Sequence, residues 1–337
     1  MTTVYGDISP RTAAYVAAKL LDRAMPQMCL SRFGQQQPIP KNKTQTIKWR
    51  RYNGFTPSTV PLVEGVTPNP DQVTHTDVTG TLAQYGRRVQ LSDVILDTHE
   101  DPVLMEYAEI LGEVAAQTSE LVIYNAIKAG TNRILSNGAA TREALNSGIL
   151  AADLNRAIRQ LNRQNAKLVT KSLKATDGVG TAPIRPAYIG ICHPDVGLAL
   201  EGVGGFKTPV EYANGQPMME NEIGAFKNIR FFGSTLFQPW LAAATTTGSG
   251  STYITNGANA TGVPDVYPII IFGADAWATV SLAGENAVHP IVVNPKPSDS
   301  DPMGQRAHVS FKTWLAAAIL QDAYMVRIET LVAQAIS

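Results

Sequence analysis

The chain has 337 residues, of which 44% are hydrophobic and only 17% charged, so it can form one to three domains with a sizeable core. An ordinary soluble domain is about 25% charged, so this low fraction indicates that much of the surface is buried or in contact with partners. The net charge of zero excludes a general electrostatic case for binding nucleic acid, and two cysteines, Cys29 and Cys192, are too few for a disulfide framework.

The charges are divided between two blocks. Residues 1–53 carry nine Lys and Arg against two acids, a net charge of +7, whereas residues 54–128 carry eleven acids against three bases, a net charge of −8. The blocks either pair within the chain or mark a basic arm that lies on the acidic surface of a neighbouring chain. No apolar run reaches the ~18 residues of a membrane helix, and Arg11 and Lys19 interrupt the first run, so we expect a cytoplasmic protein without a signal peptide or membrane contact.

The first 40 residues are unlike the start of a compact domain. A short helical pattern over residues 11–25 ends at Pro26, and the polar tract 33–43, which is interrupted by Pro38 and Pro40, should be extended. We interpret residues 1–40 as an arm. A frayed terminus is the alternative.

Residues 41–91 predict a long excursion. Residues 44–52 alternate as a strand does, with Ile47 and Trp49 on one face, and a second strand is predicted over residues 79–91. The connection between them is rich in proline and too long for a core hairpin turn. We therefore predict a two-stranded excursion that finds its partners on another subunit, with a flexible insertion as the alternative.

The longest predicted helix covers residues 101–130. Asp101 is suited to the N-cap, Pro102 to the first helical position, and Gly130 to the end of a helix roughly 40 Å long. The apolar stripe at three- and four-residue steps consists of Val103, Tyr107, Ile110, Val114, Leu121 and Asn125, widened by Leu104, Leu111 and Val122. The other face carries Glu106, Glu109, Glu113 and Glu120.

A polar loop at residues 132–147 precedes a second helix, predicted over residues 150–167. Its inward positions are Leu154, Ile158 and Leu161, and its other face carries Arg156, Arg159, Arg163 and Lys167. Such a basic face is normally just solvated. Contact with nucleic acid or an acidic partner is the alternative.

The rest of the chain predicts an α/β core followed by strands. Strands are expected over residues 185–193, 229–238, 266–272 and 289–294, and short helices over residues 196–201 and 275–282. Residues 241–262 predict a surface loop. Residues 307–320 and 324–331, joined at Gln321-Asp322, predict a closing antiparallel pair that packs on the long helix.

The motifs of common enzymes are absent from the sequence. There is no phosphate-binding glycine loop, no H-E-x-x-H and no G-x-S-x-G. Cys192 and His193 are adjacent on a predicted strand and therefore point to opposite faces, which makes them poor co-ligands for a metal. We predict no catalytic, cofactor-binding or metal-binding residues.

Three motifs resemble those of a widespread family of phage coat proteins. They are residues 61–68 (PLVEGVTP), Gln84-Tyr85-Gly86 with Leu91-Ser92-Asp93, and residues 301–306 (DPMGQR) with Phe311-Lys312. The order of arm, excursion, long helix, α/β core and closing strands is also similar to that of tailed-phage major capsid proteins, whose fold, shared with herpesvirus shells, is called the Johnson fold. The match covers nearly the whole chain and departs from the family at the Ala/Thr/Gly/Ser tract 241–262.

The resemblance implies an α+β Johnson-type capsid fold in five parts. They are an N-terminal arm (1–40), a long two-stranded extended loop (41–91), the spine helix with the first part of the peripheral domain (92–149), an axial domain (150–285), and a second peripheral part of antiparallel strands (286–337). It implies a structural protein, not an enzyme, that self-assembles as hexamers and pentamers into the icosahedral capsid of a tailed double-stranded DNA phage and encloses the packaged genome.

The resemblance also implies partners. These are further copies of the chain, scaffolding and portal proteins, in some phages a decoration protein, and packaged double-stranded DNA through non-specific contacts, with no cofactor. The implied location is the virion capsid, after assembly in the host cytoplasm. Two alternatives remain: an encapsulin-type cargo shell of the same fold, and an enzyme that uses the glycine-rich region 178–216.

Charged residues are the candidates for contacts in such a shell. Bases that could form salt bridges between subunits are Arg50, Arg51, Arg87 and Arg88, and their acidic partners would be Glu64, Asp71, Glu106, Glu109 and Glu113. The candidates for facing DNA are Arg156, Arg159, Arg163 and Lys167.

Overall fold

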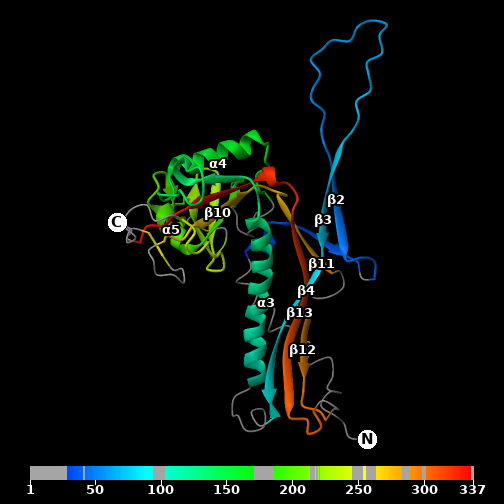
Figure 1. Cartoon of the computed structure of the whole chain (residues 1–337), viewed down its shortest axis with the longest axis vertical. Coiled ribbons are helices and arrows are strands. Elements are labelled where there is room, and N and C mark those ends of the chain that lie inside the picture. The colour runs from blue at the N-terminus through cyan, green and yellow to red at the C-terminus, as the bar shows by residue number, and fades with distance from the viewer. Residues whose placement is uncertain are drawn as a thin grey trace, which may run out of the picture.

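The computed structural model describes most of the chain. The described residues are 29–40, 42–93, 103–170, 186–212, 217, 219, 221–244, 253–255, 263–282, 289–297 and 301–334. Within them, one long helix joins a five-stranded sheet to a seven-stranded sheet, and a two-stranded hairpin stands out from the body (Figure 1). The helical pattern at residues 11–25 and the cap at Asp101 and Pro102 lie outside the described residues.

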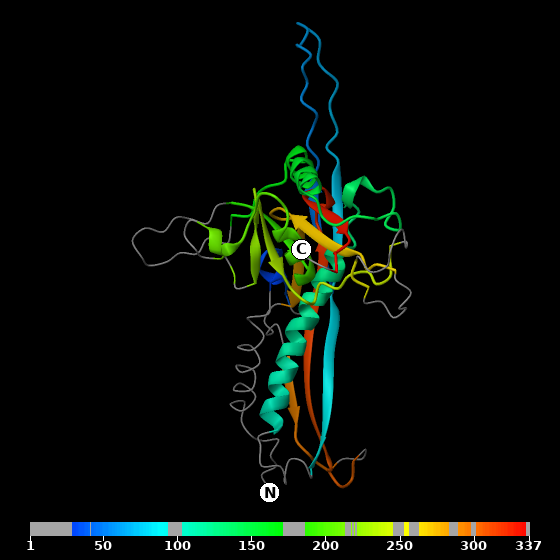
Figure 2. The same ribbon diagram turned by 90° about the vertical axis from the view of Figure 1, so that its left-hand side faces the viewer.

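The long helix α3 (Val103–Lys128) confirms the predicted helix. Its 26 residues span about 39 Å at 1.5 Å per residue. The chain leaves the helix just before Gly130, whose backbone N–H donates to the carbonyl of Ile127 at 3.2 Å. Seen from the side, α3 runs beside the long strands of the five-stranded sheet and ends at the seven-stranded sheet (Figure 2). A single helix therefore connects the two sheets.

The buried face of α3 differs from the predicted stripe. Ile110 is 46% exposed and Asn125 is exposed, whereas Ala108, Leu111 and Ala115 are buried. These three pack against the five-stranded sheet, and they include two alanines because small side chains let a strand approach the helix closely. The predicted stripe was right at Leu111, missed Ala108 and Ala115 because it gave weight to large side chains, and was wrong at Ile110 and Asn125.

The five-stranded sheet is built around one long strand. Its strands are β1 (Gln35–Ile39), β4 (Ala83–Ser92), β11 (Trp277–Leu282), β12 (His289–Val293) and β13 (Arg306–Ile319). One edge of β13 pairs antiparallel with β4, and the other edge pairs with β12 and then with β11. The strand β1 lies parallel to β11 at the edge of the sheet, where its proline, Pro38, is tolerated. The tract expected to be extended is thus held in a sheet.

Gly86 marks a close approach between β4 and β13. A Cβ atom at this position would lie 2.5 Å from the carbonyl oxygen of Phe311 on the facing strand. We expect Gly86→Ala to lower the free energy of unfolding by about 1–3 kcal/mol, since the two strands would have to separate. Denaturant titration would measure this change. The matched control is Gly54→Ala, whose Cβ would meet nothing within 4 Å and should change the stability by less than about 0.5 kcal/mol. Equal effects of the two variants would contradict the prediction.

The seven-stranded sheet forms the core of the other half. Its strands, in spatial order, are β5 (Arg133–Leu135), β14 (Met325–Thr330), β10 (Tyr267–Phe272), β6 (Tyr188–Cys192), β9 (Ile229–Gly233), β8 (Glu222–Phe226) and β7 (Phe206–Lys207). Every residue of β10 is buried, which confirms the strand expected there. The strands expected over residues 185–193 and 229–238 correspond to β6 and β9. The strand β5 and a 3-10 helix, η4 (Ser136–Gly138), lie in the region predicted as a polar loop.

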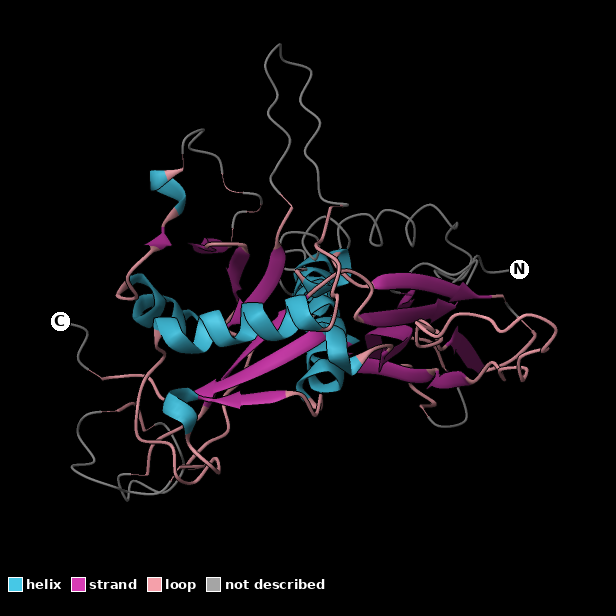
Figure 3. Ribbon diagram, turned by 90° about the horizontal axis from the view of Figure 1, so that it is seen from above, coloured by secondary structure: helices cyan, strands magenta, loops and turns pink. Residues whose placement is uncertain are grey.

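Helices cover one face of the seven-stranded sheet. The helix α4 (Ala151–Arg163) packs on β5 and β14 through Leu154 and Leu161, and α5 (Pro194–Glu201) adds Val196 and Leu200 (Figure 3). Both helices were predicted. The other face is covered by the end of α3 together with Cys29, Leu30 and Phe33, around a 3-10 helix, η3 (Leu30–Arg32).

Two predictions about the later part of the chain were wrong. Residues 277–282 form strand β11 and not a helix, because β1 and β13 satisfy its backbone from both sides. The expected antiparallel pair of residues 307–320 with 324–331 does not form: β13 belongs to the five-stranded sheet, whereas β14 pairs with β10. A 3-10 helix, η6 (Asp322–Tyr324), carries the chain from one sheet to the other.

The hairpin confirms the predicted two-stranded excursion. Its strands β2 (Thr46–Tyr52) and β3 (His75–Thr81) pair antiparallel, and the connecting residues 53–74 stand clear of the body (Figure 1). Ile47 and Trp49 lie on one half-buried face of β2, as expected. The second predicted strand is divided in two, because β3 ends at Thr81 and β4 begins at Ala83.

Candidate functional site

The connecting loop of the hairpin presents a large exposed apolar surface. Its exposed apolar side chains are Phe55 (55%), Val60 (77%), Leu62 (79%), Val63 (68%), Val66 (63%) and Val73 (51%). The tip is a turn in which the Val66 N–H donates to the Val63 carbonyl at 3.2 Å, and Gly65 adopts a φ of 77° that favours glycine. Apolar surface of this extent normally marks an interaction site. The motif at residues 61–68 thus forms the tip of an uncovered surface.

The loop is acidic, and the strands below it are basic. Glu64 and Asp71 are the only charged residues between 53 and 74, and both are exposed. On the strands, Arg50 forms a bidentate salt bridge with Asp77, with nitrogen–oxygen distances of 2.9 and 3.0 Å. Arg50 therefore has a partner within its own hairpin. Arg51, Glu64 and Asp71 have no hydrogen bond or ion pair with another described residue.

The structure does not bring the remaining interface candidates together. Arg87 and Arg88 are exposed on β4, whereas Glu109 and Glu113 are half-buried on α3, and both glutamates already have a polar or electrostatic contact. The Glu106 side chain lies outside the described part. Any pairing of Arg87 or Arg88 with the acidic loop would have to come from a second copy.

Glu120, on the predicted acidic face of α3, has an unexpected role. It is only 1% exposed, and its carboxylate accepts hydrogen bonds from the backbone N–H groups of Cys29 and Leu30 at 3.0–3.3 Å. The start of η3 is thereby tied to the helix. Burial raises the pKa of Glu120 to about 7, and the two backbone hydrogen bonds only partly oppose this rise.

Because the pKa of Glu120 is raised, its contact with Cys29 and Leu30 stabilises the fold less as the pH increases. The folded chain binds the proton on Glu120 more tightly than the unfolded chain does, so the stability is greatest below about pH 4.5 and falls as the pH rises to about 7. Between pH 5 and 8 the loss should approach about 3 kcal/mol, at 1.4 kcal/mol per pKa unit. In Glu120→Gln this loss should be absent. Unfolding curves of both proteins at pH 5 and pH 8 measure it, and parallel pH profiles would refute it.

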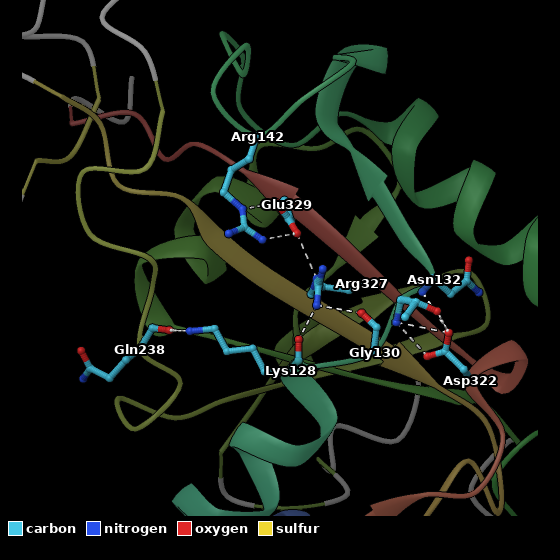
Figure 4. A network of polar contacts seen from close by, with 9 residues as sticks. Lys128, Gly130, Asn132, Arg142, Gln238, Asp322, Arg327 and Glu329 are labelled. Atoms are coloured by element: carbon cyan, nitrogen blue, oxygen red, sulfur yellow. Dashed lines mark hydrogen bonds and ion pairs between the residues drawn. The ribbon is translucent and has the colours of Figure 1, made fainter.

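A polar network fixes the end of α3 to the seven-stranded sheet (Figure 4). Glu329 of β14 is fully buried and accepts two hydrogen bonds from Arg142 at 2.6 and 2.8 Å and one from Arg327 at 3.0 Å. Arg327 also donates to the backbone carbonyls of Lys128 and Gly130, at the C-terminal end of the helix. Burial alone would raise the pKa of Glu329, but Arg142 and Arg327 outweigh it and hold the pKa below its usual value.

Two further groups complete this junction. Asp322 of η6 accepts hydrogen bonds from the N–H groups of Thr131 and Asn132 at 3.1 Å, which joins the chain after α3 to the connection between the two sheets. Trp240 stacks under Arg142, whose guanidinium carbon lies 3.8 Å from the ring centroid, and the Lys128 ammonium lies 4.3 Å away. Burial and the two arginines lower the pKa of Lys128 to about 8. No sequence motif marks this junction. Arg327 and Glu329, two charged residues that alternate along a buried strand, were the available signal.

The motif at residues 301–306 forms a turn that leads into β13. The Gly304 N–H donates to the Asp301 carbonyl at 3.1 Å, and the Asp301 carboxylate accepts from the Arg306 N–H at 3.0 Å. Gly304 has a φ of 64°, and a Cβ there would lie 2.9 Å from the backbone of Lys296. The aspartate and the glycine are thus both required by the geometry of the turn.

The basic residues near α4 share an exposed face. Arg156, Arg159 and Arg163 on the helix and Lys167 beyond its end are all exposed, opposite the buried Leu154 and Leu161. The helix thus keeps its cationic face free of the sheet.

The described residues contain no cluster of three or more His, Cys, Asp or Glu that could hold a metal ion. Burial raises the pKa of Cys192 to about 12, so its thiol remains protonated and unreactive at neutral pH. Residues 202–212 of the glycine-rich region form β7 and a 3-10 helix, η5 (Pro209–Glu211), while 178–185 lie outside the described part. Among the described helices, none is long and apolar enough to cross a membrane.

Comparisons of sequence point to one family. A family model described as phage capsid protein matches residues 76–328, about three quarters of the chain. The match begins within β3 and ends within β14, so it includes α3 and strands of both sheets. The curated proteins contain no significant match.

Comparisons of structure agree on the fold. The head structure of Helicobacter pylori bacteriophage KHP40 matches with a TM-score of 0.59 and 13% identity, covering 88% of this chain and 87% of that chain. The capsid of Ralstonia phage GP4 matches with a TM-score of 0.59 and 11% identity, covering 91% and 92%. At such identities the likeness shows a common fold alone. It confirms the predicted combination of helices and sheets.

Proposed function

The chain belongs to the phage capsid protein family and is a structural protein of a phage capsid shell, and we propose that its copies assemble as hexamers and pentamers into an icosahedral shell around the double-stranded DNA of a tailed phage. The observation that supports this assembly best is the hairpin loop 53–74, whose valines and leucine are 51–79% exposed and are not covered by any other described part of the chain. In a shell, a neighbouring copy would cover them.

The proposed subunit forms several weak contacts with neighbouring subunits. Each contact needs little affinity of its own, because repetition around a closed shell multiplies the contacts. The low charged fraction of the chain, 17%, suits a protein that hides much of its surface in this way. Arg51, Arg87 and Arg88 are proposed to attract the acidic loop of a neighbour and to set its register, while Arg50 stiffens the hairpin through Asp77.

Each part of the subunit has a proposed role in the shell. Residues 1–40 would be the N-terminal arm, residues 41–91 the extended loop with its return strand, and α3 the spine. The seven-stranded sheet would be the axial domain and the five-stranded sheet the peripheral domain. This division moves β11 to the peripheral part and β14 to the axial part, because each belongs to that sheet.

Further partners follow from the same proposal. Portal and scaffolding proteins would assist assembly in the host cytoplasm, and a decoration protein could bind outside. The exposed basic residues Arg156, Arg159 and Arg163 of α4 are proposed to contact packaged DNA without sequence preference. The protein would act without catalysis and without a cofactor.

Electron microscopy of the purified chain, alone and with co-expressed phage structural proteins, tests the proposal. We expect closed icosahedral particles built from rings of six and five copies, with loop 53–74 lying on a neighbouring copy. Small discrete oligomers with the loop in solvent would overturn it. Particles that enclose a protein cargo and exclude DNA would instead indicate a cargo shell.

A further inference from the structure

A cavity of about 360 Å³ lies at the base of the hairpin, where the hairpin meets both sheets. Its walls come from β1, β2 and β3 on one side and, on the other, from residues that follow α4, β10 and β13 in the chain together with Tyr324 of η6. This volume is at the lower end of the range for sites that bind small molecules or a few side chains. No described side chain of this chain fills the cavity, so it can accept a group from another molecule.

The hairpin wall of the cavity is one face of the β2–β3 ladder. Trp49 faces Val78 and Arg51 faces Thr76 in the antiparallel register, so these four side chains share a face. Arg50 and Asp77 form the next pair in the ladder and hold their salt bridge on the opposite face. Trp49 donates from its indole N–H to the side-chain oxygen of Gln37 at 3.0 Å, which fixes the wall against β1.

The charges that line the cavity leave one cation in excess. Three of the lining residues are basic, Arg50, Arg51 and Lys167, and one is acidic, Asp275. Arg50 is neutralised by Asp77, so Arg51 and Lys167 stand against Asp275 alone. Neither Arg51 nor Lys167 makes a side-chain hydrogen bond or ion pair with a described residue, whereas Asp275 already has a contact. One further carboxylate, flanked by apolar groups that suit Trp49 and Tyr324, would complete the site.

The tip of the hairpin loop carries that group. Glu64 lies in the turn between Val63 and Val66, and all three side chains are exposed, as is Leu62. The tip is therefore a protruding apolar surface with one negative charge, that of Glu64. It cannot enter the cavity of its own chain, because the extended hairpin carries it far from its own base (Figure 1).

We propose that the cavity receives the loop tip of a second copy, with the Glu64 carboxylate placed between Arg51 and Lys167. The contact joins the tip of one copy to the base of the next, so it is a head-to-tail contact that closes into a ring when the rotation permits. This inference rests on the proposed assembly and adds the site at which the loop docks. It also gives the carboxylate at position 64 a partner that none of the described residues of its own chain supplies.

A charge exchange tests the pairing in the full chain. Arg51→Glu and Glu64→Lys should each reduce the yield of particles roughly tenfold, and the double variant should recover most of the yield, because the opposite charges again face each other. Lys207→Glu is the control, since it reverses an exposed cation that does not line the cavity and has no proposed binding role. Circular dichroism checks that every variant is folded. Normal assembly of both single variants, or no recovery in the double variant, would overturn the inference.

A cross-linking experiment tests the same contact without relying on yield. Two differently tagged chains are mixed, one carrying Glu64→Cys and the other Thr76→Cys, and the two native cysteines are buried. Under mild oxidation we expect a disulfide-linked pair of the two tags, and no such pair when Asn155→Cys replaces Thr76→Cys. If particles form but the linked pair does not, the proposed assembly stands and this docking site is wrong. If the mixed chains do not associate at all, both are wrong.

Discussion

Replacing Glu329 with glutamine should lower the free energy of unfolding by about 3–5 kcal/mol, because it removes the carboxylate that compensates both Arg142 and the buried Arg327. An uncompensated guanidinium in this position would also weaken the hold of Arg327 on the last carbonyls of α3. Thermal or denaturant unfolding of the isolated subunit would measure the loss. The orientation of α3 against the seven-stranded sheet should loosen as well, and hydrogen exchange at residues 126–132 would report it.

Two controls separate this effect from a general cost of losing charge. Asp77→Asn removes the partner of Arg50 in an exposed salt bridge, and it should change the stability little because water and salt screen such pairs. The double variant Glu329→Gln/Arg327→Met should be less destabilised than Glu329→Gln alone, since no buried cation is then left without a partner. A loss in Glu329→Gln no larger than that in Asp77→Asn would contradict the argument.

The contribution of Glu329 to the stability depends on pH in a defined direction. The pKa of Glu329 is held below its usual value, so its stabilisation is complete above about pH 4.5 and is lost as the pH falls through the lower folded pKa. Glu120 behaves in the opposite way, because its pKa is raised to about 7 and its contribution falls as the pH rises. Both glutamine variants should therefore differ most from the unmodified chain at high pH, but with opposite signs. Glu120→Gln should become the more stable protein as the pH rises from about 4.5 to about 7, whereas the stability deficit of Glu329→Gln should shrink as the pH falls below about 4.5.

Shortening the hairpin loop should abolish assembly and leave the subunit folded. Asn53 and Thr74 close the hairpin through a backbone hydrogen bond of 2.9 Å, so residues 54–73 can be replaced by the two-residue turn Asn-Gly. The removed segment is exposed, so the stability should change by less than about 0.5 kcal/mol. The yield of particles should fall at least about 100-fold, because every copy in a shell would lose the same contact. Sedimentation and electron microscopy would measure the yield.

A second variant separates the length of the loop from its apolar character. Changing Val60, Leu62, Val63 and Val66 to serine keeps the loop at full length and leaves Glu64 in place. If burial of these side chains on a neighbour drives assembly, this variant should fail nearly as badly as the shortened one, since each buried apolar side chain contributes about 1.5–3 kcal/mol. Particles formed at the normal yield by either variant would refute the proposed role of the loop.

Sequence patterns predicted a helix or strand correctly where the local pattern of apolar residues matches the burial found in the structure. The alternation of Ile47 and Trp49 predicted β2, because a period of two is typical of a strand with one buried face. The continuous apolar run at residues 266–272 predicted β10, because such a run is typical of a strand buried on both faces. Gly130 correctly predicted the end of α3. The three family motifs correspond to the loop tip, the strand pair β4–β13 and the turn at Asp301, each with its own backbone requirement.

Local signals failed where a partner from elsewhere in the chain decided the outcome. Residues 277–282 became a strand because β1 and β13 flank them, and β14 left β13 because β10 and β5 offer it a place in the other sheet. The buried face of α3 was misjudged at Ile110, since the close approach of β13 favours alanine over large side chains. None of these partners is near in sequence.

The sequence by itself determined the long helix, the two-stranded excursion, the most buried strand and the family of this protein, because each depends on neighbouring residues or on short motifs that need a fixed backbone geometry. The tertiary structure alone decided which charges meet. It gave Arg50 a partner in Asp77, buried Glu120 against the backbone of Cys29 and Leu30, and shared Glu329 between Arg142 and Arg327. Electrostatic pairing depends on distances of a few ångströms and on burial, and both are set by contacts between residues far apart in the chain.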